Sequence, residues 1–192
     1  LSDWSSDVCS SDLEDVKIFA LEKKSDDRGV VIKTFDKAGI YDLMNGAGAL
    51  EYGHETYSKK DVLRGIHYQI EKPQARLVRV SYGAIYDVVL DVRKSSPTFG
   101  MWQAELLTSE NSGAMWVPSG VAHAYLVLSE FAIVNVQSSC EYDSTKQRII
   151  RWNDPSLAID WPLYSNYPII IPPILSERDS VGSDFLNADY CD

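Results

Sequence analysis

The sequence contains no apolar run long enough to cross a lipid bilayer. The longest candidate, residues 169–175, is short and is interrupted by Pro172 and Pro173, whereas a membrane-spanning helix needs about 20 apolar residues. The first residues also lack the basic and apolar segments of a secretory signal. We therefore expect a protein that does not associate with membranes.

Cysteine is also scarce. Cys9, Cys140 and Cys191 are the only three, they lie far apart, and no two form a Cys-x-x-Cys pair. An odd, scattered set argues against a disulfide framework and against a structural zinc site, and it is typical of a reducing compartment. The sequence therefore predicts a cytoplasmic protein.

Positive charge is in deficit. Eighteen Lys and Arg residues stand against 28 Asp and Glu residues, so the formal net charge is −10. Nucleic-acid binding depends on clustered Lys and Arg, and this balance argues against it. An anionic ligand would have to be held by a local group of arginines that acts against the overall negative field.

Apolar residues, in contrast, are numerous enough for one sizeable core, since 45% of the 192 residues are hydrophobic. Residues 1–13 differ from the rest: they nearly repeat Ser-Ser-Asp and resemble a translated sequencing adapter, with a natural disordered tail as the alternative. We expect residues 1–13 to be non-native or disordered and residues 14–192 to form a single domain.

The middle of the chain has the pattern of many short strands. Residues 77–93 alternate with a period of two, and Gly83 divides them as in a β-hairpin. Helices are expected only at residues 37–44 and after Ser180. The pattern predicts an all-β fold, a sandwich or barrel of the jelly-roll type with short peripheral helices. Further β-rich stretches, separated by turn residues, are 62–70, 101–107, 114–117, 124–128 and 131–137.

Two of the three histidines, His67 and His123, are candidates for chemistry. His67 lies inside a strand pattern, His123 lies just after a turn, and His54 lies in a polar stretch without a partner motif. Taken alone, a histidine such as His67 or His123 is more often structural than catalytic, but the inward faces of a small β-barrel converge on one cavity. A cupin metal site needs three or four His or carboxylate ligands, commonly with a His-x-His pair. Because no such pair is present, we expect neither a metal nor a cofactor.

Eight segments, in order along the chain, carry a resemblance to a known family: 27–29, 62–69, 77–80, 91–100, 116–123, 151–155, 160–162 and 174–179. They resemble the dTDP-4-dehydrorhamnose 3,5-epimerases, which are cupin-type jelly rolls (double-stranded β-helices). The resemblance implies a homodimeric isomerase that acts on a nucleoside-diphosphate-linked 4-keto-6-deoxy sugar. Such an enzyme epimerises C3, C5 or both by removing a proton next to the C4 ketone.

The resemblance also implies the catalytic residues. His67 matches the family's base, and Asp179 matches the carboxylate that orients it and raises its basicity. His123 matches a second histidine that contacts the substrate. Asp87 matches a carboxylate near the site, for which a structural role is the alternative.

Five further residues are implied as substrate-binding. Arg64 and Arg28 match arginines that bind the diphosphate through paired donors, and Arg28 is expected from the partner subunit. Arg76 takes the place of a lysine that stabilises the oxyanion in the family. Gln147 takes the place of a glutamate, and Arg178 that of the lysine before the dyad aspartate.

The positions of Arg64 and His67 present a conflict. Residues three apart face opposite sides of a regular strand. A bulge or twist at Gly65 would bring both side chains to one side.

The chain departs from the family at the general acid. The family's tyrosine falls on Val136, and valine cannot donate a proton. Another donor must return the proton, with Tyr125 and Tyr142 as candidates, or water does so, or the step does not occur. The thymine-contacting segment of the family is not visible in residues 51–57, and an aromatic residue that packs the base falls on Glu141.

These departures leave three functions open. Epimerisation at one centre is favoured over epimerisation at both. A sugar-nucleotide ketoisomerase shares the fold and relays a proton on one face of the sugar. A non-catalytic paralogue that binds nucleotide sugars would retain the arginines and lose the chemistry.

Overall fold

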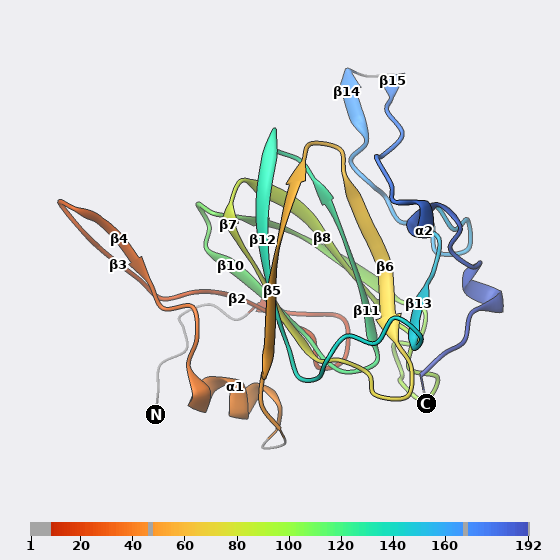
Figure 1. Ribbon diagram of the computed structural model, residues 1–192, viewed down its shortest axis with the longest axis horizontal. Helices are drawn as coiled ribbons and strands as arrows, with labels where there is room; N and C mark the ends of the chain where they lie inside the picture. Colours follow the sequence, from red (N-terminus) through yellow and green to blue (C-terminus); the bar gives the residue numbers. More distant parts are fainter. Residues whose placement is uncertain (1–8, 46–47, 167–168, 192) are drawn as a thin grey trace.

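Two antiparallel β-sheets face each other across the core (Figure 1). The computed structural model describes residues 9–45, 48–166 and 169–191. The six-stranded sheet has the order β1 (Cys9–Ser10), β2 (Lys17–Ala20), β10 (Gly113–Val117), β7 (Arg76–Tyr82), β12 (Phe131–Ser138) and β5 (Tyr52–Lys59). The five-stranded sheet has the order β13 (Gln147–Ile149), β6 (Leu63–Gln69), β11 (Val121–Val127), β8 (Ala84–Asp91) and β9 (Trp102–Thr108).

Hairpins and short helices lie around this sandwich. The hairpins are β3 (Lys23–Asp26) with β4 (Gly29–Ile32), and β14 (Tyr164–Asn166) with β15 (Ile169–Ile170); the helices are α1 (Lys37–Leu43), α2 (Glu177–Ser180) and the 3₁₀ turn η1 (Phe185–Asn187). No helix in the described part of the chain is long and apolar enough to cross a membrane. The predicted all-β, cupin-type jelly roll with short helices is confirmed.

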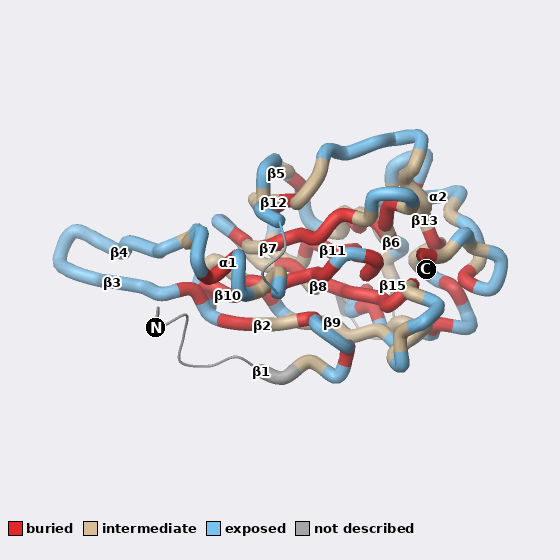
Figure 2. Tube along the Cα trace, turned by 90° about the horizontal axis from the view of Figure 1, so that it is seen from below, coloured by how far each residue is buried: buried red, intermediate tan, exposed pale blue. Residues whose placement is uncertain are grey.

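Three apolar layers hold the fold together. Val78 and Val89 pack between the sheets. Because side chains alternate along a strand, Val88 points the other way and packs in a second cluster with Trp161. On the outer face of the six-stranded sheet, α1 contributes the buried Ile40. Figure 2 shows the buried segments concentrated on the central strands, with the β3–β4 hairpin exposed along its whole length.

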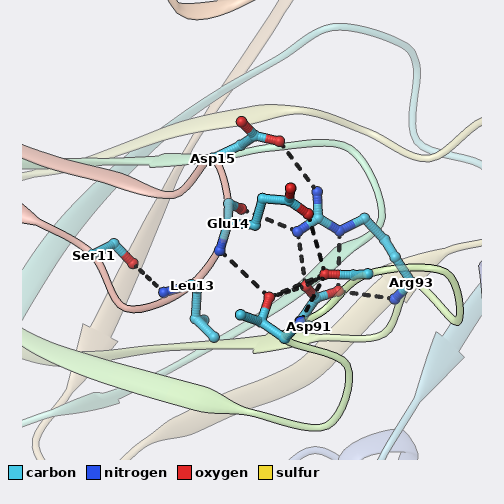
Figure 3. A network of polar contacts seen from close by, with 8 residues as sticks. Ser11, Leu13, Glu14, Asp15, Asp91 and Arg93 are labelled. Atoms are coloured by element: carbon cyan, nitrogen blue, oxygen red, sulfur yellow. Dashed lines mark hydrogen bonds and ion pairs between the residues drawn. The ribbon is translucent and has the colours of Figure 1, made fainter.

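A polar network fastens the N-terminal segment to the turn after β8 (Figure 3). Arg93 donates to the buried Asp91 at 2.7 Å and 3.0 Å and to the backbone oxygen of Glu14 at 3.0 Å. Leu13 is only 2% exposed and packs between the sheets, although the sequence analysis left it outside the domain. The native or foreign origin of residues 1–13 stays a prediction.

Asp91 gives the fold a predictable response to acid. Burial acts to raise the pKa of Asp91, but hydrogen bonds from Arg93, Ser96 and Thr98 outweigh it and lower the pKa to about 2, against 3.8 for an unperturbed aspartate. The ionised carboxylate of Asp91 therefore stabilises the folded state fully above about pH 4, and this stabilisation is lost as the pH falls toward 2. We expect the free energy of unfolding, measured by urea denaturation, to fall by about 2 kcal/mol through Asp91 over this interval. In Asp91→Asn this contribution should be absent, and an unchanged pH slope would contradict the assignment.

Candidate active site

A cavity of about 600 Å³ opens between the two sheets. One wall comes from β5, β7 and β12 of the six-stranded sheet, and the opposite wall comes from β6, β11 and β13 of the five-stranded sheet. The predicted site residues that line it are Arg64, His67, Arg76, His123 and Gln147. These five predicted residues come from four separate strands.

His67 and Asp179 form the predicted pair. The ring nitrogen Nε2 of His67 is hydrogen-bonded to Oδ1 of Asp179, which lies buried in α2. Ser176 donates to the other carboxylate oxygen at 2.8 Å. Burial acts to raise the pKa of Asp179, but the hydrogen bond and charge of His67 and the Ser176 hydroxyl outweigh it and lower the pKa. A carboxylate held ionised at Nε2 leaves Nδ1 of His67 to act as the base.

The irregularity that the sequence analysis required at Gly65 is present. His67 pairs with His123 and Arg64 pairs with Tyr125, so the step of three residues on β6 faces a step of two on β11. This bulge places both Arg64 and His67 in the cavity wall.

Gly65 is required for this bulge. Its φ angle is +123°, and a Cβ atom there would lie 2.5 Å from the Cβ of Ala124 and 2.7 Å from the carbonyl oxygen of His123. We expect Gly65→Ala to lower the free energy of unfolding by at least about 2 kcal/mol in urea denaturation. Gly53→Ala is the matched control, because a Cβ at Gly53 has no neighbour closer than 3.8 Å. Equal stability of the two variants would contradict this account.

His123 forms a second histidine–carboxylate pair. Its Nε2 lies 2.7 Å from Oδ1 of Asp87, and both side chains are buried. The second oxygen of Asp87 has no hydrogen-bond partner among the described residues. Because His123 pairs in register with His67, the two imidazoles lie side by side on one wall of the cavity.

Two arginines of the cavity, Arg76 and Arg64, donate to uncharged groups. Nη1 of Arg76 donates to the backbone oxygen of His67 at 3.3 Å, and Nη2 donates to Gln74 at 3.1 Å. Nε of Arg64 donates to the hydroxyl of Ser58 at 3.1 Å. Within the described ranges, neither arginine forms an ion pair with a carboxylate. Burial lowers the pKa of Arg76 to about 10, so its charge is held at an energetic penalty that a bound anion would relieve.

Two of the predicted substrate-binding residues do not line the cavity of their own chain. Arg178 lies at its rim, where it donates to Gln147 at 2.6 Å and to the hydroxyl of Tyr142 at 2.9 Å. Arg28 lies at the turn of the β3–β4 hairpin, pairs with Asp26 and has a side chain that is 89% exposed.

Val136, the position to which the resemblance assigns the family's acid, lines the cavity. The two tyrosines considered as replacements also line the cavity, and the hydroxyl of each already has a side-chain partner. The hydroxyl of Tyr125 lies 2.6 Å from that of Thr56, and burial raises the pKa of Tyr125. The hydroxyl of Tyr142 donates to Gln147 at 2.9 Å.

Tyr52 and His54 are cavity residues that the sequence analysis did not identify. Both lie on β5, the edge strand of the six-stranded sheet. In the sequence the alternation of residues 52, 54 and 56 was the available signal, but these residues are polar and β5 was not among the predicted strands. Among the described residues, no group of three or more His, Cys, Asp and Glu side chains could hold a metal.

The fold and the site define a cupin-type jelly roll whose cavity is arranged for proton transfer beside an anion. A sequence model of the dTDP-4-dehydrorhamnose 3,5-epimerases matches residues 10–187. A dTDP-4-dehydrorhamnose 3,5-epimerase of Pseudomonas aeruginosa is 38% identical over 177 residues, which cover 92% of this chain and 94% of the relative. The chain therefore belongs to the dTDP-4-dehydrorhamnose 3,5-epimerase family, and the resemblance seen in the sequence is confirmed.

Solved structures agree with this membership. The dTDP-6-deoxy-D-glucose-3,5-epimerase of Legionella pneumophila, in complex with dTDP-4-keto-L-rhamnose, has a TM-score of 0.89 and 32% identity, covering 95% of this chain and 94% of that chain. A 3'-monoepimerase of Streptomyces bikiniensis in complex with dTDP-quinovose has a TM-score of 0.81 and 29% identity, covering 91% and 85% respectively.

Proposed function

We propose that this protein is an isomerase that removes a proton next to the C4 ketone of a dTDP-linked 4-keto-6-deoxy sugar and epimerises C3, C5 or both. The observation that carries the proposal is the His67–Asp179 pair at a cavity whose two arginines have no carboxylate partner among the described residues. The ligands named for the related structures support a thymidine diphosphate sugar. The three scattered cysteines of the sequence, no two of which form a Cys-x-x-Cys pair, support a cytoplasmic location.

The chemistry assigns a step to each group. Nδ1 of His67 takes the proton from the carbon next to the ketone, and the electrons of that C–H bond form the enolate, whose charge lies on the C4 oxygen. Asp179 stabilises the resulting imidazolium, as a carboxylate does for a catalytic histidine. Arg76 and Arg64 supply positive charge for the enolate and the diphosphate, where buried donors act most strongly.

Deuterium exchange tests this function. Incubation of the protein with dTDP-4-keto-6-deoxyglucose in D₂O should introduce deuterium at C3, at C5 or at both, read by NMR and mass spectrometry. Label at C3 alone supports a single-centre epimerase, and label at both carbons supports the full reaction. Binding of dTDP without any exchange would contradict the proposal and favour the non-catalytic paralogue. A ketoisomerase would instead move the carbonyl group to C3, which NMR distinguishes.

We also propose that the protein is a homodimer in which Arg28 completes the partner's cavity. The β3–β4 hairpin projects from the body of the chain (Figure 1) and exposes apolar side chains, with Val30 56% and Val31 72% accessible. Exposed valines at the end of a projecting hairpin favour burial against another chain. Light scattering should give a mass near twice 21.5 kDa.

Arg28→Ala is expected to raise KM about tenfold or more, because a hydrogen bond to a charged group contributes about 1.5–3 kcal/mol. Mixing it with His67→Asn tests the arrangement. A mixed dimer would combine the intact His67 of one chain with the intact Arg28 of the other, so activity at low substrate concentration should recover. No recovery after subunit exchange would mean that Arg28 does not act across the interface.

A further inference from the structure

We propose that His54 is the proton donor on the face of the sugar opposite His67, in place of the tyrosine that Val136 replaces. The inference rests on the proposed function and adds the group that this reaction still lacks.

The register of β5 against β12 places His54 beside Val136, where the tyrosine of the family is missing. His54 is the direct cross-strand partner of Val136. Side chains of directly opposed residues in an antiparallel pair lie on the same face, with Cβ atoms about 4.5–5.5 Å apart. Both residues line the cavity. The side chain of His54 therefore lies next to that of Val136, the residue that stands in the place of the family's tyrosine.

The neighbours of His54 on β5 indicate that its side chain is on the face of the strand that borders the cavity. Tyr52 and Thr56, two residues away on either side, also line the cavity, and the hydroxyl of Thr56 lies 2.6 Å from that of Tyr125 on the opposite sheet. Glu55, between His54 and Thr56, does not line the cavity and accepts a hydrogen bond from the hydroxyl of Tyr57, which does not line it either. His54 thus belongs to the inward set.

His54 and His67 lie on opposite walls. His67 extends from β6 of the five-stranded sheet, whereas His54 extends from β5 of the six-stranded sheet. A sugar ring bound between the walls presents one face to each histidine. Tyr125 is on the same sheet as His67 and has a raised pKa, and Tyr142 is engaged by Gln147 and Arg178. Among the groups considered, His54 is therefore the better-placed donor for the second face.

The electrostatic surroundings suit a donor. Burial, followed by the positive charges of Arg76 on β7 and His123 on β11, lowers the pKa of His54. Its imidazolium is a stronger acid than that of a free histidine and far stronger than a tyrosine hydroxyl. A lowered pKa reduces the population of the His54 imidazolium. The negative charge of the enolate favours the imidazolium and partly offsets this reduction.

The step is balanced in protons and electrons. The enolate oxygen re-forms the C4 carbonyl, and the electron pair of the carbon–carbon double bond takes the proton of the His54 imidazolium on the face away from His67. His54 becomes neutral and regains a proton from water, while the His67 imidazolium releases to water the proton that it took from the substrate. No oxidant, reductant or metal takes part.

Separate measurement of exchange and inversion tests the proposal. In D₂O, His67 of a His54→Asn variant can still remove a proton and return a deuteron to the same face. We expect deuterium exchange to continue while formation of the inverted product falls about 100-fold or more. Glu55→Gln, on the outer face of the same strand, is the control and should match the unmodified protein. Binding of dTDP, measured by calorimetry, verifies that each variant retains its fold and its cavity.

A second variant tests the position. Adding Val136→Tyr to His54→Asn should restore inversion at least tenfold, because the phenol would stand on the same wall. Unchanged inversion in His54→Asn would overturn the proposal, and so would weakened dTDP binding with proportionate loss of exchange and inversion, which would assign His54 to the nucleotide. Loss of inversion in Tyr52→Phe but not in His54→Asn would overturn it as well. Absence of exchange in the unmodified protein would instead refute the proposed function itself.

Discussion

Replacing His67 by asparagine is expected to lower both deuterium exchange and product formation by about 10²–10⁴-fold, the usual contribution of a positioned general base. Asparagine retains a side-chain donor that can bond Asp179, but it has no nitrogen of suitable basicity. The loss should appear in kcat, with dTDP binding unchanged, because the nucleotide is held by other groups. Exchange measured by mass spectrometry at saturating substrate reports this loss directly.

Asp179→Asn provides the matched control for the pair. Asparagine occupies nearly the same volume and can still bond Ser176, which lies 2.8 Å from the carboxylate. It carries no charge to stabilise the His67 imidazolium, so exchange should fall, and the fall should be smaller than in His67→Asn. Full activity in His67→Asn would contradict the assignment of the base. A larger loss in Asp179→Asn than in His67→Asn would indicate that the carboxylate itself takes the proton.

The fold was largely predictable because its central strands are buried. Residues 77–93 alternate cleanly, since one side of β8 faces the interior between the sheets and the other packs beneath the C-terminal segment. The turn at Gly83 is present, but the predicted hairpin is wrong. β7 ends at Tyr82 in the six-stranded sheet, and β8 starts at Ala84 in the five-stranded sheet, so the chain crosses between the sheets there. Burial imposes apolar residues at fixed intervals, and this is the signal that sequence patterns report.

The strand that carries the proposed donor was not predictable in this way. Most residues of β5 are exposed, because it is an edge strand and its inner face borders a cavity rather than the core. Polar residues on both faces remove the alternation of apolar and polar residues on which strand prediction depends. His54 consequently read as an isolated histidine in a polar stretch. Only its pairing with Val136 reveals its surroundings.

Resemblance to the family identified site residues only in or near the segments where this chain matches the family's motifs. Resemblance located His67, Arg64 and Arg76, all of which line the cavity, because the motifs around them are intact. Resemblance did not predict which residues replace the family's acid and base-packing aromatic, which it assigns to Val136 and Glu141. At such positions the replacement must come from another strand, and spatial proximity between distant residues is what the three-dimensional structure adds.

Replacing Arg76 by methionine is expected to have opposite effects on activity and stability. Loss of a buried donor to a developing oxyanion lowers kcat/KM by about 10²–10³-fold. The folded protein without substrate should become more stable. Burial lowers the pKa of Arg76 to about 10, so at neutral pH its charge is less favourable in the folded state than in the unfolded state. After allowance for the lost hydrogen bonds to His67 and Gln74, we expect a gain of about 1 kcal/mol in urea denaturation.

Arg76→Lys separates charge from shape. Lysine keeps the positive charge at the position where the family carries lysine, so this variant should lose less activity than Arg76→Met and should not gain its stability. A methionine variant that retained full activity would show that Arg76 does not face the reacting oxygen. A methionine variant that lost both activity and stability would show that Arg76 supports the cavity wall as a structural residue. The proposed role requires activity to fall while stability rises, because a cation held without a carboxylate partner is favourable only when the anionic substrate is bound.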